Sequence, residues 1–353
     1  MARWTVVLPV LGLVVLAATW ARDPGALVLV VVGAFLAGSV LAAVHHAEVV
    51  AHRVGEPFGS LVLAVAVTVI EVALIVTLMV SGGPETATLA RDTVFAAVMI
   101  TCNGIVGLSL LVGALHTRVA TFNAEGTATA LATVSTLATL CLVLPTFTTA
   151  RAGPEFSPGQ LAFAAAASLS LYGLFVFVQT VRHRDYFLPE SAEPDGHAAP
   201  PSDRETVTSL GLLVVALVAV VGLAKIESPA IEAAVAAIGA PPSAVGVAIA
   251  LLVLLPETLA AVRNARRDRV QTSFNLALGS AMASIGLTIP ALAVATIWLD
   301  TPLELGLGAT QTVLLAITVV VASLTVLPGR ATLQEGGVHL VLFGAFLFLA
   351  ANP

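Results

Sequence analysis

Long apolar segments recur along the whole chain, and they limit what it can fold into more than any other feature. About eleven of them approach 20 residues, the length that an α-helix needs to cross the hydrocarbon core of a bilayer. Hydrophobic residues make up 58% of the 353 residues and charged residues 10%, whereas a soluble domain carries about a quarter charged residues. We therefore predict an all-α polytopic membrane protein with about 11 transmembrane helices.

The expected spans follow the apolar runs from one end of the chain to the other. They cover residues 4–20, 25–44, 58–80, 93–115, 127–148, 158–181, 206–224, 243–262, 273–298, 304–327 and 335–352.

The distribution of lysine and arginine predicts the orientation, because cytoplasmic loops carry an excess of these residues. The N-terminus and the even-numbered loops hold eleven of them: Arg3, Arg53, Arg118, Arg182, Arg184, Arg204, Arg263, Arg266, Arg267, Arg269 and Arg330. The odd-numbered loops hold four: Arg22, Arg91, Arg151 and Lys225. We expect a multi-pass protein of the cell inner (cytoplasmic) membrane, with its N-terminus in the cytoplasm and its C-terminus outside.

A polar stretch at residues 182–205 divides the chain, and its prolines, acids and small residues are typical of a linker. We predict an extra N-terminal helix in residues 1–22, a five-helix repeat in 23–181, this cytoplasmic linker, and a second five-helix repeat in 206–353. Because five is odd, two such repeats enter the membrane with opposite orientations. Inverted repeats of this kind are common in secondary transporters, whose ion sites lie near the midplane.

Two acidic residues lie inside apolar spans, Glu71 in the third span and Glu257 in the eighth. Each falls in the second helix of its predicted repeat. A charged side chain at the centre of a membrane costs about 2.5–3.5 kcal/mol even on insertion scales. Burial favours a protonated carboxyl group, whereas a bound cation favours the ionised form. We therefore predict that Glu71 and Glu257 hold either protons or a metal cation; the alternative is that each is a neutral, hydrogen-bonded packing residue.

Other oxygen donors are expected near the two acids. Thr68 lies one helical turn before Glu71, and Pro256 lacks the N–H that would pair with the carbonyl of Leu252. Asn103, Ser280 and Ser284 lie in the spans that follow the two acidic ones. Close helix packing is the alternative explanation for the serines. Two carboxylates among hard oxygen donors suit Ca²⁺, and a monovalent cation remains open.

Several long motifs carry a resemblance to a known family. The segment GEPFGSLVLAVAVTVIE, residues 55–71, resembles the first signature of the cation/proton exchangers in the calcium/cation antiporter superfamily. The segment LLPETLAAVRNARRDRVQTSFNLALGSAMASIGLTIP, residues 254–290, resembles the second. The likeness to bacterial sodium–calcium/proton antiporters continues through ARDTVFAAVMITCNGIVGLSLLVG and FVFVQTVRHRDYFL, so it covers most of the chain.

This resemblance implies ten core helices after an extra N-terminal helix, and a cation bound between the two signature glutamates. It also implies alternating access, in which the first two helices of each repeat slide against the others. The chain departs from the broader pattern, which has Gly-Asn before each glutamate where this chain has Val67-Thr68 and Val253-Leu254. The histidine that follows the second glutamate in that pattern is Thr258 here.

A polar cluster precedes the third span. His45, Glu48 and His52 share one helical face, so a regulatory metal or pH-sensing site is one hypothesis, and a solvated helix end is the other. Glu56 occupies a position where the family signature has an acid, and we expect it to guide ions inward. His52 is included with it as an entry or regulatory residue.

The function that these features favour is secondary active Ca²⁺/H⁺ antiport that extrudes cytoplasmic calcium. Na⁺(K⁺)/H⁺ antiport on the same fold is the alternative, and a cation channel is a weaker one. We expect no enzyme, because neither HExxH nor GxSxG occurs, and no ATP-driven pump, because GxxxxGK[ST] is absent. No cofactor and no nucleic-acid partner are expected; the partners are inorganic cations, protons and membrane lipid, and a homo-oligomer is compatible with these features.

Overall fold

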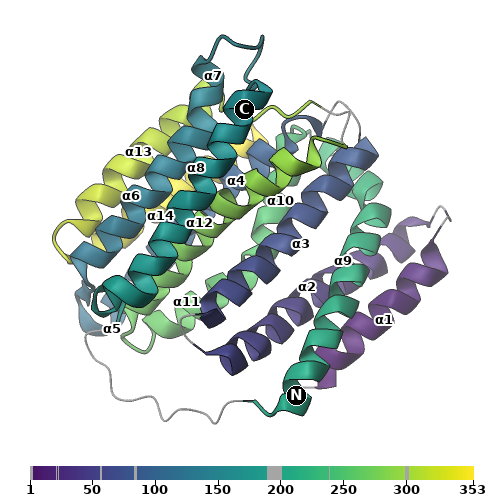
Figure 1. Ribbon diagram of the computed structural model, residues 1–353, viewed down its shortest axis with the longest axis horizontal. Helices are drawn as coiled ribbons and strands as arrows, with labels where there is room; N and C mark the ends of the chain where they lie inside the picture. The colour runs from purple at the N-terminus through teal and green to yellow at the C-terminus, as the bar shows by residue number, and fades with distance from the viewer. Residues whose placement is uncertain are drawn as a thin grey trace.

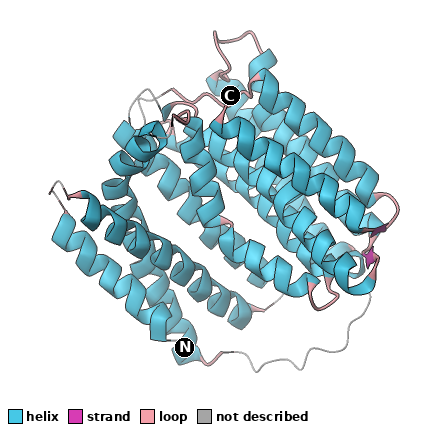
Figure 2. Ribbon diagram, turned by 180° about the vertical axis from the view of Figure 1, so that it is seen from behind, coloured by secondary structure: helices cyan, strands magenta, loops and turns pink. Residues whose placement is uncertain are grey.

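The computed structural model describes residues 3–20, 22, 24–55, 58–82, 86–188, 201–237, 239–298 and 302–353, with side chains described for all of these except 58–61 and 81–82. In this part of the chain nearly every element is a helix, and the long helices run side by side (Figure 1, Figure 2). Among the described residues, nine helices are long and apolar enough to cross a membrane, or ten when one bent pair is counted as a single span. The predicted all-α polytopic membrane fold is confirmed.

The helices follow the chain in the order expected from the apolar runs. Those of the first part are α1 (Arg3–Thr19), α2 (Ala26–Val54), α3 (Phe58–Gly82), α4 (Leu89–Met99), η2 (Ile100–Ile105), α5 (Val106–Thr117), α6 (Ala124–Ala138), η3 (Thr139–Val143), α7 (Leu144–Phe147), α8 (Pro158–Phe177), η4 (Val178–Arg182) and η5 (Arg184–Phe187). Those of the second part are α9 (Asp203–Ala237), α10 (Ser243–Val253), α11 (Leu255–Ala265), α12 (Val270–Ala295), α13 (Ala309–Val326) and α14 (Leu333–Ala351). Two short strands, β1 (Ala120–Thr121) and β2 (Arg330–Ala331), complete the list.

The eighth expected span is not one continuous helix. It is divided into α10 and α11, which meet at Leu254 with a bend of 50°. Pro256, in the first turn of α11, has no N–H to continue the hydrogen-bond ladder, and a proline ring inside a helix clashes with the carbonyl group four residues earlier. The bend therefore creates a second helix N-terminus inside the span, directly before Glu257.

One peripheral group contains α1, α2 and α9, which lie together on one side of the molecule (Figure 1). Small residues allow these helices to approach each other closely. A Cβ on Gly222 of α9 would lie 2.3 Å from Leu16 of α1, and one on Gly38 of α2 would lie 2.9 Å from Leu8. Such small-residue contacts are the usual means of helix association in a membrane.

A central helix, α12, lies among α3, α6, α8 and α11, and most of its residues are buried. The continuous rod of α4, η2 and α5 is also enclosed by its neighbours. Three π-helical segments interrupt the long helices, namely η2, η3 and η4. Local π-helical turns are rare and often occur at functional sites.

The loops meet in two separate sets, as they must when successive helices cross in alternate directions. Strand β1 after α5 pairs with β2 after α13, and Arg53 in the last turn of α2 forms an ion pair with Asp203 in the first turn of α9. All of these belong to even-numbered loops. Odd-numbered loops meet one another elsewhere, because the Glu304 N–H donates to the Ala87 carbonyl and the Gly306 N–H donates to the Pro154 carbonyl.

Candidate functional site

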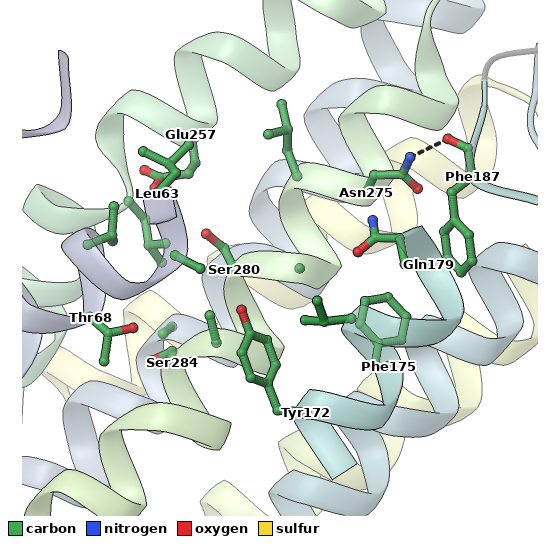
Figure 3. Close-up of a pocket in the computed structure, with 18 of the residues that line it drawn as sticks. Leu63, Thr68, Tyr172, Phe175, Gln179, Phe187, Glu257, Asn275, Ser280 and Ser284 are labelled. Atoms are coloured by element: carbon green, nitrogen blue, oxygen red, sulfur yellow. Dashed lines mark hydrogen bonds between the residues drawn. The ribbon is translucent and has the colours of Figure 1, made fainter. Parts of the chain in front are cut away.

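A cavity of about 330 Å³ lies between α3, α8, α10, α11 and α12, and both Glu71 and Glu257 line it. Figure 3 shows side chains from these helices around it, with Glu257, Thr68, Ser280 and Ser284 toward one end and Gln179 and Asn275 toward the other. Most of the lining is apolar, with Val67, Ala97 and Phe175 among the residues that form its wall. The few polar groups are therefore the ones that determine what the cavity binds.

Glu71 is the more deeply held of the two acids. It is 5% exposed, and Ile70 and Leu74 on the same helix are buried in the core. The hydroxyl of Ser284 on α12 donates a hydrogen bond to Glu71 Oε1 at 2.6 Å. Thr288, one turn further along α12, lies beside the same carboxyl group. Helix α12 therefore supplies the hydrogen-bonding environment of an acid that belongs to α3.

Glu257 has a different environment. It is 8% exposed, and its Oε2 atom is buried with no hydrogen-bond partner among the described residues. It occupies the first turn of α11, where the free N–H groups and the helix dipole favour a negative charge. Glu71 and Glu48 are close enough for their charges to act on it. A buried oxygen atom without a partner is a place where a cation or a proton would complete the bonding.

Hydroxyl groups add neutral oxygen donors to the same end of the cavity. Thr68 lies one turn before Glu71 and is 6% exposed, and Ser280 and Ser284 lie one turn apart on α12. All three were predicted as binding residues, and the structure brings all three to the cavity with Glu71 and Glu257. Carboxylate and hydroxyl oxygens are hard donors of the kind that Ca²⁺ and Na⁺ accept.

Asn103 is not part of this group, although it was predicted as a ligand. It lies on η2 outside the cavity lining, where its Nδ2 donates to Thr318 Oγ1 at 2.9 Å. Its Oδ1 lies 3.1 Å from His339 Nδ1. The polar partners of this buried amide are thus supplied by α13 and α14, and the structure does not bring Asn103 to the cavity that holds Glu71 and Glu257.

The remaining predicted residues lie elsewhere. Leu252 packs against the hydrophobic core and is not among the lining residues of the cavity. His52 is exposed on the last turn of α2, away from the cavity, and Glu56 falls outside the described residues. Within the described ranges no three His, Cys, Asp or Glu side chains are placed to hold a metal ion. The hypothesis of a regulatory metal at His45, Glu48 and His52 is therefore not supported by the geometry.

The cavity also contains polar residues that the sequence analysis did not select. They are Tyr172 from α8, Gln179 and Thr180 from η4, Arg184 from η5, and Thr272 and Asn275 from α12. Gln179 did carry a signal, because an amide in an apolar run needs a partner. Asn275 carried the same signal, because it is an amide in the apolar span that also holds Ser280 and Ser284. Tyr172 and Arg184 could not be found in this way, since both are remote in sequence from the two acids.

A helical membrane bundle in which two buried acids from different spans face one cavity defines a class of protein, the membrane exchangers of inorganic cations. The chain belongs to the sodium/calcium exchanger protein family, whose model matches residues 24–181 and 208–352. These two matches lie within the two segments, 23–181 and 206–353, proposed above as repeats, a division that stays a prediction.

Individual relatives extend over nearly the full chain. The chain is 45% identical to y4hA of Sinorhizobium fredii (strain NBRC 101917 / NGR234), whose name describes it as an ionic transporter, over 99% of this chain and 96% of the relative. It is 33% identical to the sodium-potassium/proton antiporter ChaA of Escherichia coli (strain K12), over 97% of this chain and 94% of the relative. The resemblance to cation/proton exchangers is thereby confirmed.

Solved structures show the same fold. The H⁺/Ca²⁺ exchanger CAX superposes with a TM-score of 0.74 at 16% identity, over 98% of this chain and 86% of that one. Native YfkE superposes with a TM-score of 0.71 at 17% identity, over 99% of both chains. The protein is therefore a multi-pass membrane exchanger with the fold of these transporters.

Proposed function

We propose that the protein is a secondary active antiporter that exchanges cytoplasmic Ca²⁺ for protons at Glu71 and Glu257. The observation that carries this proposal is that both acids, although 186 positions apart in the sequence, line one membrane-buried cavity together with Thr68, Ser280 and Ser284.

The exchange follows from competition for the same oxygen atoms. With both carboxyl groups protonated the site carries no charge, and with both ionised it carries two negative charges that one Ca²⁺ neutralises. Leaving two charges in the apolar cavity with neither ligand is costly. The site therefore changes its access from one side of the membrane to the other only when it holds either two protons or one divalent cation, and this couples the two fluxes.

Na⁺(K⁺)/H⁺ exchange is the second candidate. It is favoured by the relative at 33% identity, which is named a sodium-potassium/proton antiporter. Glu71 and Glu257 also differ in their surroundings, since Glu71 has a hydroxyl donor and Glu257 Oε2 has no partner among the described residues. A single monovalent ion bound mainly at one acid is compatible with that asymmetry.

The direction of access is part of the proposal. Arg184 and Leu188, at the end of α8 and its extension, line the cavity and precede the linker that the lysine and arginine distribution assigns to the cytoplasm. The cavity is therefore proposed to open on the cytoplasmic side, with the N-terminus in the cytoplasm and the C-terminus outside.

The direct test uses inside-out membrane vesicles with a preformed, acidic-inside pH gradient. Adding CaCl₂, NaCl or KCl to the wild type is expected to dissipate the gradient for the transported ion. Glu71→Gln and Glu257→Gln are each expected to reduce this response at least a hundredfold, because an amide cannot exchange a proton for a cation.

Glu155→Gln is the matched control, since Glu155 lies in a loop, pairs with Arg151 and does not line the cavity. It is expected to transport at the wild-type rate. Size-exclusion profiles in detergent would show that all variants are folded. Transport at the wild-type rate in folded Glu71→Gln or Glu257→Gln protein would exclude the mechanism.

A further inference from the structure

One end of the cavity carries a positive charge, which is unexpected for a cation pathway. The charged residues of its lining are the acids Glu71 and Glu257 and one base, Arg184. Arg184 begins the short helix η5, directly after the π-helical end of α8. A cation that approaches the acids from this end therefore passes a guanidinium group.

The backbone that carries Arg184 is held firmly in place. Asn275 on α12 donates a hydrogen bond from Nδ2 to the Phe187 carbonyl at 2.6 Å (Figure 3). The amide of Asn275 is itself fixed, because Gln271 Nε2 donates to its Oδ1 at 2.9 Å. The ring of Phe187 packs edge-on against Phe175 with centroids 5.6 Å apart. The position of η5 relative to the cavity is thus determined by α8 and α12.

A further contact comes from α6, whose Gly126 lies directly against η5. A Cβ at this position would lie only 2.3 Å from the Tyr186 carbonyl oxygen. This close approach leaves η5 no room to move toward α6. The segment η5, which carries Arg184 at the cavity, is therefore held in position by α6, α8 and α12.

The charge of Arg184 is not paired within the described part of the chain. The three ion pairs there join Arg53 with Asp203, Arg91 with Asp92, and Arg151 with Glu155. Its sequence neighbour Asp185 is exposed and does not line the cavity. Arginine stays protonated at every physiological pH. The guanidinium group of Arg184 is therefore the source of positive charge in the lining of the cavity.

We propose that Arg184 selects cations by valence at this end of the cavity. The inference rests on the proposed exchange function, because it concerns the path by which cations reach Glu71 and Glu257. The electrostatic free energy of an ion in a given potential is proportional to its charge. The guanidinium group therefore opposes a divalent cation twice as strongly, in free energy, as a monovalent one. Arg184 thus shifts the balance between Ca²⁺ and Na⁺ or K⁺ toward the monovalent ions.

The proportionality to charge makes the proposal quantitative. At a pH high enough that protons do not compete for the two acids, removing the charge should lower the half-saturating concentration of a monovalent ion by a factor f and that of a divalent ion by about f². For a partly solvated charge near the mouth, f is expected to be about two, which gives about fourfold for the divalent ion. The factor should fall toward one as ionic strength rises, because salt screens an exposed charge.

The experiment measures half-saturating concentrations of Ca²⁺, Na⁺ and K⁺ in inside-out vesicles that contain the wild type, Arg184→Gln or Arg184→Lys. Ionic strength is set with N-methyl-D-glucamine chloride. Arg184→Gln is expected to show the f and f² pattern, and Arg184→Lys, which keeps the charge, should stay near the wild-type values. Arg182→Gln is the matched control, since Arg182 is exposed but does not line the cavity; its effect should be smaller.

Each outcome is informative about one proposal or the other. Unchanged half-saturation in Arg184→Gln, equal factors for both valences, or a full effect from Arg182→Gln would each overturn the role of Arg184. A wild type that moves no protons in response to any of the three cations would instead overturn the proposed function. Where only one valence is transported, the other is assayed as a competitor of that transport, and the same two factors apply.

Discussion

The two acids of the cavity differ in what holds them. Glu71 accepts a hydrogen bond from Ser284, whereas Glu257 has a buried oxygen without a partner and the N-terminal turn of α11 behind it. A donor hydroxyl and a helix N-terminus both favour the ionised carboxyl group. The ionised form of both acids is thus favoured, by a hydroxyl donor at Glu71 and by a helix N-terminus at Glu257.

Replacing Ser284 tests whether its hydrogen bond favours the ionised form of Glu71. Ser284→Ala removes the 2.6 Å hydrogen bond to Glu71, and a hydrogen bond to a charged group contributes about 1.5–3 kcal/mol. The ionised form of Glu71 loses this support, so protons compete more strongly with the cation. We expect the half-saturating cation concentration in the vesicle assay to rise about tenfold or more near pH 7, and the increase to be smaller at higher pH.

Thr136→Ala provides a control for Ser284→Ala, because Thr136 is exposed on α6 and its hydroxyl bonds only to the Ala132 carbonyl. It should leave the half-saturating concentration unchanged. Equal values for Ser284→Ala and the wild type across the pH range would show that this hydrogen bond does not influence binding.

Much of the acidic end of the cavity could be predicted from the sequence. An acid inside an apolar run has a cost that demands a partner, and Thr68, Ser280 and Ser284 follow from helical spacing and from the adjacent spans. Asn103 shows the limit of this reasoning, because the cost of burying an amide requires a partner but does not identify it. Only the packing of α13 and α14 against η2 determines that its partners are Thr318 and His339.

At the scale of single elements, the bend between α10 and α11 has the clearest effect on the site. It turns the continuous span expected over residues 243–262 into two helices and places Glu257 in the first turn of the second. Pro256 made an interruption foreseeable, but its 50° angle depends on neighbouring helices. The π-helical segments η2, η3 and η4 had no recognisable sequence signal.

Close packing of α10 against α4 holds the first half of this bent pair. A Cβ on Gly246 would lie 2.8 Å from the Thr93 backbone nitrogen, and backbone atoms cannot move aside as a flexible side chain can. We expect Gly246→Ala to destabilise the protein by about 1–3 kcal/mol and to lower its unfolding temperature in detergent.

Gly211→Ala is the corresponding control, because no atom lies within 4 Å of a Cβ at Gly211 on α9. This substitution should leave the unfolding temperature unchanged or raise it slightly, since alanine has the higher helix propensity. If both variants unfold at the wild-type temperature, the α4–α10 contact is less rigid than its geometry indicates.

At the scale of the whole molecule, the loops separate into two sets, as alternate crossing requires. The sequence predicts which set is cytoplasmic from eleven basic residues against four, and the contacts between loops are consistent with the alternation itself. The packing of α1, α2 and α9 into one peripheral group could not be read from the apolar runs, because it depends on which faces carry small residues.

The orientation can be measured with thiols. Cys102 and Cys141 are both buried, so an introduced surface cysteine should react alone. Ala150 is exposed in the loop before α8, and Ser202 is exposed directly before α9, so the span that contains α8 and η4 lies between them in the sequence. With a membrane-impermeant maleimide, Ala150→Cys is expected to react in intact cells and Ser202→Cys only in inside-out vesicles. The reverse pattern would place the N-terminus outside and overturn the proposed direction of access.

The peripheral group joins helices of very different length. Helix α9 has 35 residues and α1 has 17, which correspond to about 52 Å and 26 Å at 1.5 Å per residue. The hydrocarbon core of a bilayer is about 30 Å thick, so it is thinner than the length of α9 and thicker than the length of α1. Helix α9 is therefore expected to tilt or to project from the core, and the bilayer is expected to thin beside α1. The acyl-chain length of the surrounding lipids therefore sets the hydrophobic mismatch at this edge of the protein, and with it a free-energy cost.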